Sequence, residues 1–380
     1  MKIGIVCYPT FGGSGVVATE LGKGLAKLGH EIHFITYSQP IRLDFFNENL
    51  YFHEVDIQSY PLFRYPPYES ALASKMVDVV KHEKLELLHV HYAIPHASAA
   101  CMAQQILKGQ GIEIPVVTTL HGTDITLVGK DPSLAPVVTF SINQSNGITA
   151  VSESLKQETL SLFDIEKPIE VIYNFIDLDR FKNTRKDHYK KAICRQGEKL
   201  LVHTSNFRKV KRLEDVVKIF RKVRQKIPGK MLLVGDGPER TSIERMCRKL
   251  GACEDIRFVG KVEAVEDLLP LADGFLMPSE KESFGLAALE AMACEVPVIS
   301  SNAGGLPELN LHGKTGFLSE VGDIDGMANN TLKMLQDDQL PVFKANALQR
   351  ARDFSLSNIL PQYESYYYNI IELFYKEKKG

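Results

Sequence analysis

The sequence predicts an α/β protein built from two doubly wound domains, each with a parallel sheet. Short apolar runs alternate with helical stretches along the chain, and this alternation is typical of parallel α/β sheets. The pattern breaks after residue 173 and then restarts with the same rhythm, which favours two sheets over one. The length of 380 residues agrees, because a single hydrophobic core rarely grows so large.

The predicted elements follow one another in a regular order. In the first half we expect a helix at Val16–Leu28 and strands at Ile3–Cys7, His30–Thr36, Leu87–His91, Val116–Leu120, Gly147–Val151 and Ile169–Tyr173. In the second half we expect helices at Arg212–Lys226, Glu239–Leu250 and Leu286–Cys294, and strands at Lys199–His203, Met231–Val234, Ile256–Gly260, Gly274–Pro278 and Val296–Ser300.

This order predicts the domain limits. An N-terminal domain is expected over residues 1–170, a junction over 171–198, and a second domain over 199–355. Residues 356–380 are expected to form a last helix, because apolar and tyrosine side chains recur there at helical spacing. Such a helix most often packs against a domain, and less often contacts a membrane.

Composition excludes several classes of protein. A hydrophobic fraction of 44% and a charged fraction of 24% are typical of a soluble globular chain. No run approaches the roughly 18 apolar residues of a membrane span. Met1-Lys2 passes directly into a strand-like run, unlike a signal peptide, so we expect a cytoplasmic location.

The cysteines and the net charge exclude further classes of protein. Six scattered cysteines form no C-x-x-C pair, so neither a disulfide framework nor a zinc site is indicated. A net charge of −2 argues against a general nucleic-acid-binding protein. Residues 182–226 nevertheless hold 16 Lys and Arg against 4 Asp and Glu. Most of these should form a solvated surface, and a few are candidates for binding an anion.

Two glutamates, Glu282 and Glu290, bracket a glycine-containing turn and the start of an apolar helix. Backbone N–H groups at that helix start would favour an anion. A helical span of eight residues rises about 12 Å, more than the roughly 5 to 9.5 Å between paired glycosidase carboxylates. The spacing therefore favours two separate contacts on a ligand with hydroxyls at both ends and phosphate between them, such as a nucleotide-sugar. Two surface glutamates of an ordinary helix would show the same bare spacing.

Two other patterns lie near predicted strand ends. Gly12-Gly13-Ser14-Gly15 lacks the spacing of a dinucleotide fingerprint, but its backbone could approach a phosphate, and a ligand-free turn is an equal alternative. The histidines His89, His91, His96 and His121 show no recognisable metal-ligand spacing. Hydrogen-bonding roles are favoured for them, and no metal site is expected.

The stretch S-E-K-E-S-F-G-L-A-A-L-E-A-M-A-C-E-V-P-V-I, followed by G-G-L-P-E, resembles the donor-binding signature of the retaining glycosyltransferases of family GT4. The resemblance implies the GT-B fold, with two Rossmann-like domains facing a central cleft and a C-terminal helix that returns to the first domain.

The resemblance also implies roles for donor-binding residues. Glu290 would receive the ribose hydroxyls, Glu282 would orient the sugar, and the turn of Ser283, Phe284, Gly285 and Leu286 would bind diphosphate and sugar hydroxyls. Gly13 would lie beside the diphosphate, Val262 would meet the uracil through its backbone, and His121 would face the donor sugar.

The basic pair of the family departs from its usual spacing here. Lys211 aligns with the family lysine, whereas Asn206 occupies the usual arginine position and Arg208 lies two residues later. The resemblance implies that Lys211 and Arg208 offset charge on the departing diphosphate, together with Glu282 and His121 as the catalytic group. Whether Asn206 or Arg208 takes the arginine role stays open.

Six stretches together are similar to the GT4 members that begin bacillithiol biosynthesis: K-I-G-I-V-C-Y-P-T-F-G-G-S-G, H-V-H-Y-A-I-P-H, T-T-L-H-G-T-D-I-T, Y-N-F-I-D, S-N-F-R-K-V-K-R and S-E-K-E-S-F-G. This similarity implies transfer of N-acetylglucosamine from UDP-GlcNAc to the hydroxyl of L-malate with retained configuration. The acceptor would lie near Ser14, Tyr92, Thr119 and Thr123, with Arg64 as a further candidate.

The expected partners are thus the small molecules UDP-GlcNAc and L-malate, with no cofactor, no metal, no nucleic acid and no stable membrane insertion. A homo-oligomer is left open. Three alternatives also remain: a GT4 transferase acting on a lipid or sugar acceptor, a GT-B-fold UDP-GlcNAc epimerase, and a non-catalytic nucleotide-sugar sensor.

Overall fold

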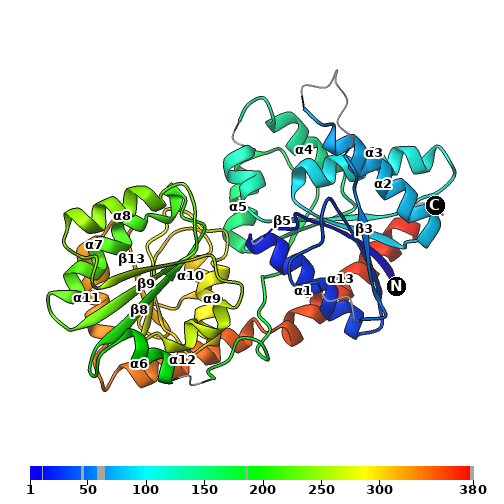
Figure 1. Cartoon of the computed structure of the whole chain (residues 1–380). Helices are drawn as coiled ribbons and strands as arrows, with labels where there is room; N and C mark the ends of the chain where they lie inside the picture. The colour runs from blue at the N-terminus through cyan, green and yellow to red at the C-terminus, as the bar shows by residue number, and fades with distance from the viewer. Residues whose placement is uncertain (11, 44–46, 58–64, 130, 185–186, 377–380) are drawn as a thin grey trace. The chain divides into compact units, whose positions relative to one another are not determined.

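Two parallel sheets organise the chain (Figure 1). The structure is a computed structural model that describes residues 1–10, 12–43, 47–57, 65–129, 131–184 and 187–376. One unit comprises Met1–Asn174 together with Leu356–Gly380, and the other comprises Phe175–Ser355.

The first unit holds a parallel sheet whose order is β3-β2-β1-β4-β5-β6-β7 within the described residues. Its strands are β1 (Lys2–Val6), β2 (Glu31–Thr36), β3 (Leu50–Glu54), β4 (Leu87–His91), β5 (Val116–Leu120), β6 (Gly147–Ala150) and β7 (Ile169–Val171). Its helices are α1 (Gly13–Lys27), α2 (Tyr68–Glu83), η1 (Ala93–Ala97), α3 (Ser98–Lys108), η2 (Asp124–Val128), α4 (Ala135–Gln144), α5 (Glu153–Leu162) and α13 (Leu356–Lys376).

The second unit holds a parallel sheet in the order β10-β9-β8-β11-β12-β13 over the described part of the chain. Its strands are β8 (Lys199–Thr204), β9 (Gly229–Val234), β10 (Ile256–Gly260), β11 (Gly274–Met277), β12 (Val298–Ser301) and β13 (Gly316–Ser319). Its helices are α6 (Asp187–Ile193), η3 (Lys209–Lys211), α7 (Leu213–Arg224), α8 (Arg240–Lys249), η4 (Val265–Asp267), η5 (Leu269–Leu271), α9 (Leu286–Ala293), α10 (Leu306–Leu309), α11 (Ile324–Met334) and α12 (Leu340–Asp353).

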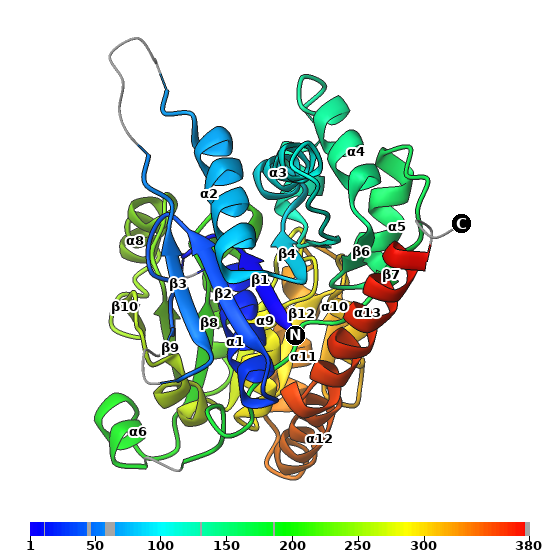
Figure 2. The same ribbon diagram turned by 90° about the vertical axis from the view of Figure 1, so that its right-hand side faces the viewer.

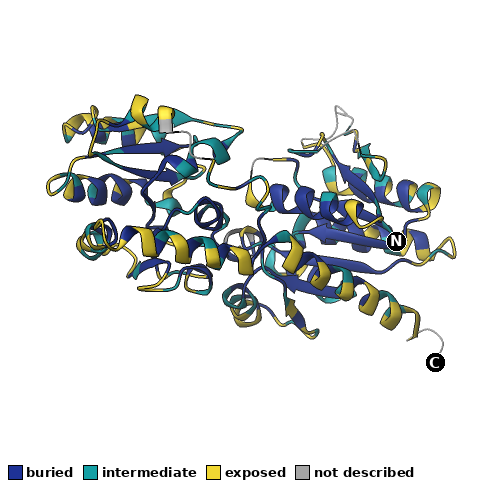
Figure 3. Ribbon diagram, turned by 90° about the horizontal axis from the view of Figure 1, so that it is seen from below, coloured by how far each residue is buried: buried dark blue, intermediate teal, exposed yellow. Residues whose placement is uncertain are grey.

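The central strands are buried on both faces, as expected where helices cover both sides of a parallel sheet. Every residue of β4, β5 and β11 is buried, and Figure 3 shows dark strands between helices that expose only their outer sides. Burial on both faces explains why these strands read as apolar runs in the sequence. The two-domain α/β prediction is therefore confirmed.

The structure corrects two expectations about organisation. Residues 171–198 are not a separate junction, because 171–174 belong to the first unit and 175–198, including α6, belong to the second. The edge strand β3 was not predicted. Its burial pattern is mixed, since it has a neighbour on one side only, so its residues do not form the apolar run of a central strand.

The last helix, α13, returns to the first unit as predicted and packs against α1 (Figure 2). Tyr363 and Tyr367 are fully buried on this helix. The phenol of Tyr367 lies 2.7 Å from Nδ1 of His89 on the central strand β4. Tyr366 receives a hydrogen bond from the backbone N–H of Ile148 at 2.8 Å. The tyrosines seen at helical spacing thus anchor α13 to the sheet through polar as well as apolar contacts.

Replacing Tyr367 with Phe should destabilise the first unit, because a buried nitrogen of His89 would lose its partner. The expected loss is roughly 1–3 kcal/mol of unfolding free energy, measured by urea denaturation. Tyr368→Phe is the matched control, since Tyr368 is exposed on the same helix and should change stability by less than about 0.5 kcal/mol. Equal effects of the two substitutions would contradict the anchoring role.

Candidate functional site

Each sheet has one point where the strand order reverses, between β1 and β4 in the first unit and between β8 and β11 in the second. At such a point, the loops that follow the two strands leave in opposite directions, and ligands of open α/β sheets bind in the resulting crevice. Most of the predicted site residues fall into two groups, each at or next to one of these points, whereas Val262 follows the edge strand β10.

In the second unit, Lys211 and Glu282 meet across the reversal. Lys211 ends η3 in the loop after β8, and Glu282 lies in the loop after β11. The Lys211 ammonium donates to a carboxylate oxygen of Glu282 at 2.6 Å, and both side chains are largely buried. Ser279 donates its hydroxyl to the same oxygen at 2.9 Å. The predicted cation and the predicted sugar-orienting carboxylate therefore form one unit.

The loop that carries Lys211 adopts unusual backbone angles. Phe207 and Arg212 both have positive φ, 40° and 50°, which non-glycine residues rarely adopt. A non-glycine residue holds such a conformation only where its surroundings fix it, and this happens most often at functional sites. Asn206 and Arg208 are exposed on this loop, so both can reach a ligand, and the structure does not choose between them.

The Gly235-Asp236-Gly237 turn after β9 packs closely against the backbone of the Lys211 loop. A Cβ atom on Gly235 would lie 1.9 Å from the carbonyl oxygen of Ser205, and one on Gly237 would lie 2.1 Å from that of Asn206. Gly235 also has a φ of 119°. Only glycine permits this approach, so the turn is part of the architecture that fixes the Lys211 loop.

The turn before α9 lies where the sequence predicted it, with Gly285 as the N-cap at a φ of 99°. Phe284 is buried, and Ser283 and Leu286 are half-buried. The helix begins only at Leu286, so the helical-rise estimate for the two glutamates is wrong: Glu282 precedes the helix and is held in a loop. Glu290 lies within α9 and is buried.

The loop of Glu282 is also closely packed against the Gly304-Gly305 turn. The backbone N–H of Gly305 donates to the carbonyl of Glu282 at 2.9 Å, and a Cβ atom on Gly304 would lie 1.9 Å from that carbonyl oxygen. Gly304 therefore cannot carry a side chain here.

Val262 follows β10 and is half-buried. Two residues earlier, the carbonyl of Gly260 accepts from the N–H of Gly235 at 2.7 Å.

In the first unit, hydroxyl groups meet across the reversal. Ser14 lies in the first turn of α1 after β1, and Tyr92 follows β4 directly. Their hydroxyls are 2.7 Å apart, and the side chain of Thr123 after β5 lies near the phenol of Tyr92. Burial raises the pKa of Tyr92 to about 12, so its phenol stays protonated. Tyr92 has a φ of 92°, so it is a third strained position in a site loop, after Phe207 and Arg212. Gly13, exposed, begins α1 beside them.

Thr119 does not join this group through its side chain. Its hydroxyl is fully buried inside the sheet, 2.7 Å from Nε2 of His89 and 2.6 Å from the hydroxyl of Thr149. A side chain engaged in the core cannot contact an acceptor, so the expectation that Thr119 binds the acceptor is wrong for its hydroxyl. Its backbone carbonyl instead accepts from the N–H of Tyr92 at 2.9 Å. Arg64 lies outside the described residues.

The half-buried His121 lies beside Tyr92 and contacts the buried His91. Its Nε2 is 2.8 Å from Nδ1 of His91, and its ring centre is 5.3 Å from that of Tyr92. Burial lowers the pKa of His121 to about 3 and that of His89 to about 3 as well, so both are neutral at pH 7. Neutral imidazoles can donate and accept hydrogen bonds, but they offer no positive charge to an anion.

Sequence reasoning missed Asp124, the acid of the H-G-T-D stretch. Its carboxylate accepts from the backbone N–H groups of Ala93 and Gly122, both at 2.9 Å, and it therefore ties the loops after β4 and β5 together. Burial raises its pKa to about 6. The position of an aspartate two residues after the glycine that follows β5 could have indicated this role.

His203 was also missed in the second unit. Its Nδ1 donates to the carbonyl of Leu276 at 2.8 Å, which links β8 to β11 at the reversal, and its Nε2 is 2.8 Å from the hydroxyl of Ser205. Burial lowers its pKa to about 4. The strands β8 and β11, whose following loops contain Lys211 and Glu282, are thus joined by a side-chain hydrogen bond as well as by backbone pairing.

Two family models match the chain on either side of the division. Residues 11–180 match the model described as Glycosyltransferase Family 4, and residues 184–350 match Glycosyl transferases group 1. The chain is also 50% identical over 378 residues to an N-acetyl-alpha-D-glucosaminyl L-malate synthase of Bacillus anthracis, covering 98% of this chain and 97% of that protein. The chain belongs to glycosyltransferase family 4.

Other similarities agree with this family assignment. An uncharacterised glycosyltransferase of Methanocaldococcus jannaschii is 29% identical, covering 89% of this glycosyltransferase and 90% of that protein. Among solved structures, a sucrose-phosphate synthase of Thermosynechococcus elongatus superposes with a TM-score of 0.82 at 20% identity, covering 98% and 100% of the two chains. Anabaena HepE in complex with UDP and glucose gives 0.81 at 20% identity, covering 96% and 98%.

These structural similarities show the GT-B fold that the sequence predicted. The glycosyltransferase has, among its described residues, no helix that is both long enough and apolar enough to cross a membrane.

The buried histidines of this glycosyltransferase should make it sensitive to acid. His89, His96, His121 and His203 have pKa values lowered by burial to about 3 or 4, from an ordinary 6.5. Between pH 6.5 and 4 the unfolded chain therefore binds more protons than the folded chain, so unfolding free energy falls as pH is lowered. Each histidine contributes at most about 1.4 kcal/mol per pH unit. Asp124, with its raised pKa, opposes this trend between pH 6 and 3.8 but is a single group.

Urea denaturation from pH 7 to pH 5 measures this dependence. His96→Gln should make the slope shallower by about one proton, because one buried histidine is removed. His82→Gln should leave the slope unchanged, since His82 is exposed on α2. If unfolding free energy changed with pH to the same extent in His96→Gln and in the unmodified chain, the buried histidines would not be the cause of the loss of stability in acid.

Proposed function

We propose that this glycosyltransferase transfers N-acetylglucosamine from UDP-GlcNAc to the hydroxyl of L-malate, the reaction that begins bacillithiol biosynthesis. The observation that carries the proposal is the 50% identity over nearly the whole length of both chains to the Bacillus anthracis L-malate synthase. The aligned region covers the predicted site residues at both reversals of strand order, which we call the switch points. It therefore includes the residues of the first unit that would select the acceptor.

The same comparison supports retention of configuration. The name of the Bacillus anthracis protein specifies an alpha-D-glucosaminyl product. Because the sugar of UDP-GlcNAc is itself α-linked, a product of α configuration requires that the configuration at C1 be retained. We therefore propose a front-face substitution: the malate oxygen bonds to C1, the bond from C1 to the β-phosphate oxygen breaks, and a phosphate oxygen takes the hydroxyl proton.

The second unit supplies the groups that this reaction needs at the donor. Lys211 has three N–H donors and uses at least one on Glu282, so the same ammonium can also bind a diphosphate oxygen. The exposed Arg208 lies three residues earlier, and the start of α9 offers backbone N–H groups. Fixed cations and a helix end can offset the charge that develops on departing UDP, so the proposed mechanism requires no metal. Glu290 would accept from the ribose hydroxyls.

The first unit supplies neutral groups suited to the acceptor. Ser14, Tyr92 and Thr123 present hydroxyls at one place, and α1 begins there with neither a side-chain cap nor an acidic residue in its first turn. The N–H groups at that helix start favour an anion, which in our proposal is a malate carboxylate. Asp124 acts as a positioning residue, because it fixes the loops of Tyr92 and Thr123.

The decisive test of the function is UDP release from UDP-GlcNAc with and without L-malate. We expect release that depends on L-malate and no release with succinate, which has both carboxylates but lacks the hydroxyl. The anomeric configuration of the product, read by NMR, should be α. Release without any acceptor would favour the epimerase, and no release with L-malate would favour another acceptor or a sensor.

Lys211→Ala should reduce turnover far more than it weakens UDP binding. Loss of one fixed donor to a developing charge typically removes about 3–4 kcal/mol of transition-state stabilisation, which corresponds to a fall in kcat of roughly a hundredfold or more. Lys209→Ala is the matched control, because Lys209 is exposed in the same short helix. Equal losses in kcat and in UDP affinity would show that Lys211 only binds the nucleotide.

A further inference from the structure

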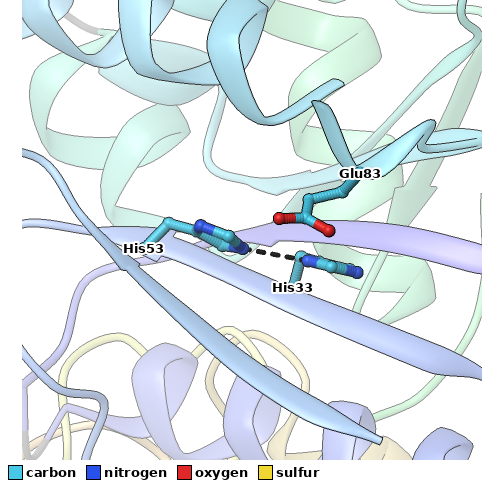
Figure 4. A group of neighbouring side chains, drawn as sticks. All are labelled: His33, His53 and Glu83. Carbon is cyan, nitrogen blue, oxygen red and sulfur yellow. Dashed lines mark hydrogen bonds between the residues drawn. The ribbon is translucent and has the colours of Figure 1, made fainter. Parts of the chain in front are cut away.

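In the first unit, three side chains from separate elements lie close together beside the sheet. They are distinct from the group formed by Ser14, Tyr92 and Thr123. His33 belongs to β2, His53 to the edge strand β3, and Glu83 is the last residue of α2. One ligand atom from each lies within 4.8 Å of the other two. Figure 4 shows the two imidazoles side by side, with the carboxylate of Glu83 directed toward them.

The strand register explains why the two histidines meet. His33 pairs with Tyr51 and Ile35 pairs with His53, so His33 and His53 lie on the same face of adjacent parallel strands. That face packs against α2, because Ile35 shares a core cluster with Leu72 and Met76 of that helix. The carboxylate at the end of α2 is thereby brought over the pair.

The distances suit a tetrahedral ion. Nδ1 of His33 and Nε2 of His53 are 2.9 Å apart. Two nitrogen ligands at the usual 2.0–2.1 Å from a tetrahedral zinc ion lie roughly 3.3 Å apart, so a shift of a few tenths of an ångström would admit the ion. Without an ion, one imidazole must donate to the other.

A supporting shell is also present. The other nitrogen of His33, Nε2, lies 3.0 Å from a carboxylate oxygen of Glu31, which Lys2 holds at 2.7 Å. Metal-bound histidines usually donate their second N–H to a carboxylate in this way, which fixes the tautomer that leaves the first nitrogen for the metal. Burial lowers the pKa of both His33 and His53, and a metal needs the neutral form.

The place of Glu83 adds a separate argument. The carboxyl end of a helix carries partial negative charge, which disfavours a carboxylate in its last turn and favours a cation. Glu83 occupies that last turn of α2. A bound cation would offset both the helix end and the carboxylate.

We propose that His33, His53 and Glu83 bind a zinc ion that joins the edge strand β3 to β2 and α2. Two imidazoles and a carboxylate are ligands for a transition metal and not for magnesium or calcium, which prefer oxygen alone. The site stabilises the first unit and takes no part in sugar transfer. Three residues separate Glu83 from the start of β4, whereas Tyr92 follows the end of that strand.

The test is zinc titration of the full chain after chelator treatment, by calorimetry and by competition with a chromogenic zinc indicator. The exposed thiol of Cys253 is alkylated in every sample, so that it cannot bind the metal. We expect one zinc ion per chain, no binding of magnesium at the same concentrations, and a rise in Tm on zinc addition, because a ligand that binds only the folded state stabilises it.

Variants separate this site from ordinary surface histidines. His53→Ala and Glu83→Gln should each weaken zinc binding at least tenfold and abolish the rise in Tm, whereas His82→Ala should behave as the unmodified chain. His82 is the matched control because it is exposed and directly precedes Glu83. Circular dichroism of the metal-free variants shows whether they are folded, and glycosyl transfer by His53→Ala should be unchanged.

Zinc bound equally well by His53→Ala, Glu83→Gln and the unmodified chain would overturn the proposal, and so would the absence of zinc binding to the unmodified chain. Cobalt gives an independent reading. Its visible absorption in the unmodified chain should be that of a tetrahedral or five-coordinate ion, and octahedral absorption would also overturn the site as proposed.

Discussion

The reversal of strand order in each parallel sheet is the constraint on which both candidate sites depend. It separates the loops that follow β1 and β4, and likewise those that follow β8 and β11, and so leaves room for a ligand at the strand ends. Short polar contacts bridge each reversal, among them Ser14 with Tyr92 and Lys211 with Glu282. Residues far apart in sequence become neighbours only because the strands that precede them are neighbours.

The loops at these points are held more firmly than loops usually are. Phe207, Arg212 and Tyr92 have positive φ, which the surrounding structure must stabilise. In the second unit, glycine turns pack against the backbones of Ser205 and Glu282 so closely that no Cβ atom fits. In the first unit, the carboxylate of Asp124 binds two loops at once. Rigid loops suit a site that must offset charge without rearranging during the reaction.

The sequence predicted central elements better than it predicted contacts. The bounds of β4 and β5 agree with the predicted runs, because strands buried on both faces must be apolar. The edge strand β3 and the zinc group it carries were missed, since an edge strand is only partly buried and its ligands come from three elements. The partners Lys211 and Glu282 are 71 residues apart, and no local pattern encodes such a contact. Thr119 was misplaced because its position near a strand end does not reveal whether its hydroxyl points into the core.

The two units differ in the way they can recognise charge. The second has Lys211 and Arg208 as cations, whereas the switch-point group of the first consists of hydroxyls and of histidines that burial keeps neutral. In the mechanism that we propose, a carboxylate of the acceptor binds the N–H dipoles at the uncapped start of α1, beside Ser14. Dipoles bind a carboxylate without placing a fixed cation next to the malate hydroxyl. In the proposed mechanism the malate oxygen therefore keeps its nucleophilic character, and the cations of the second unit act on the leaving diphosphate.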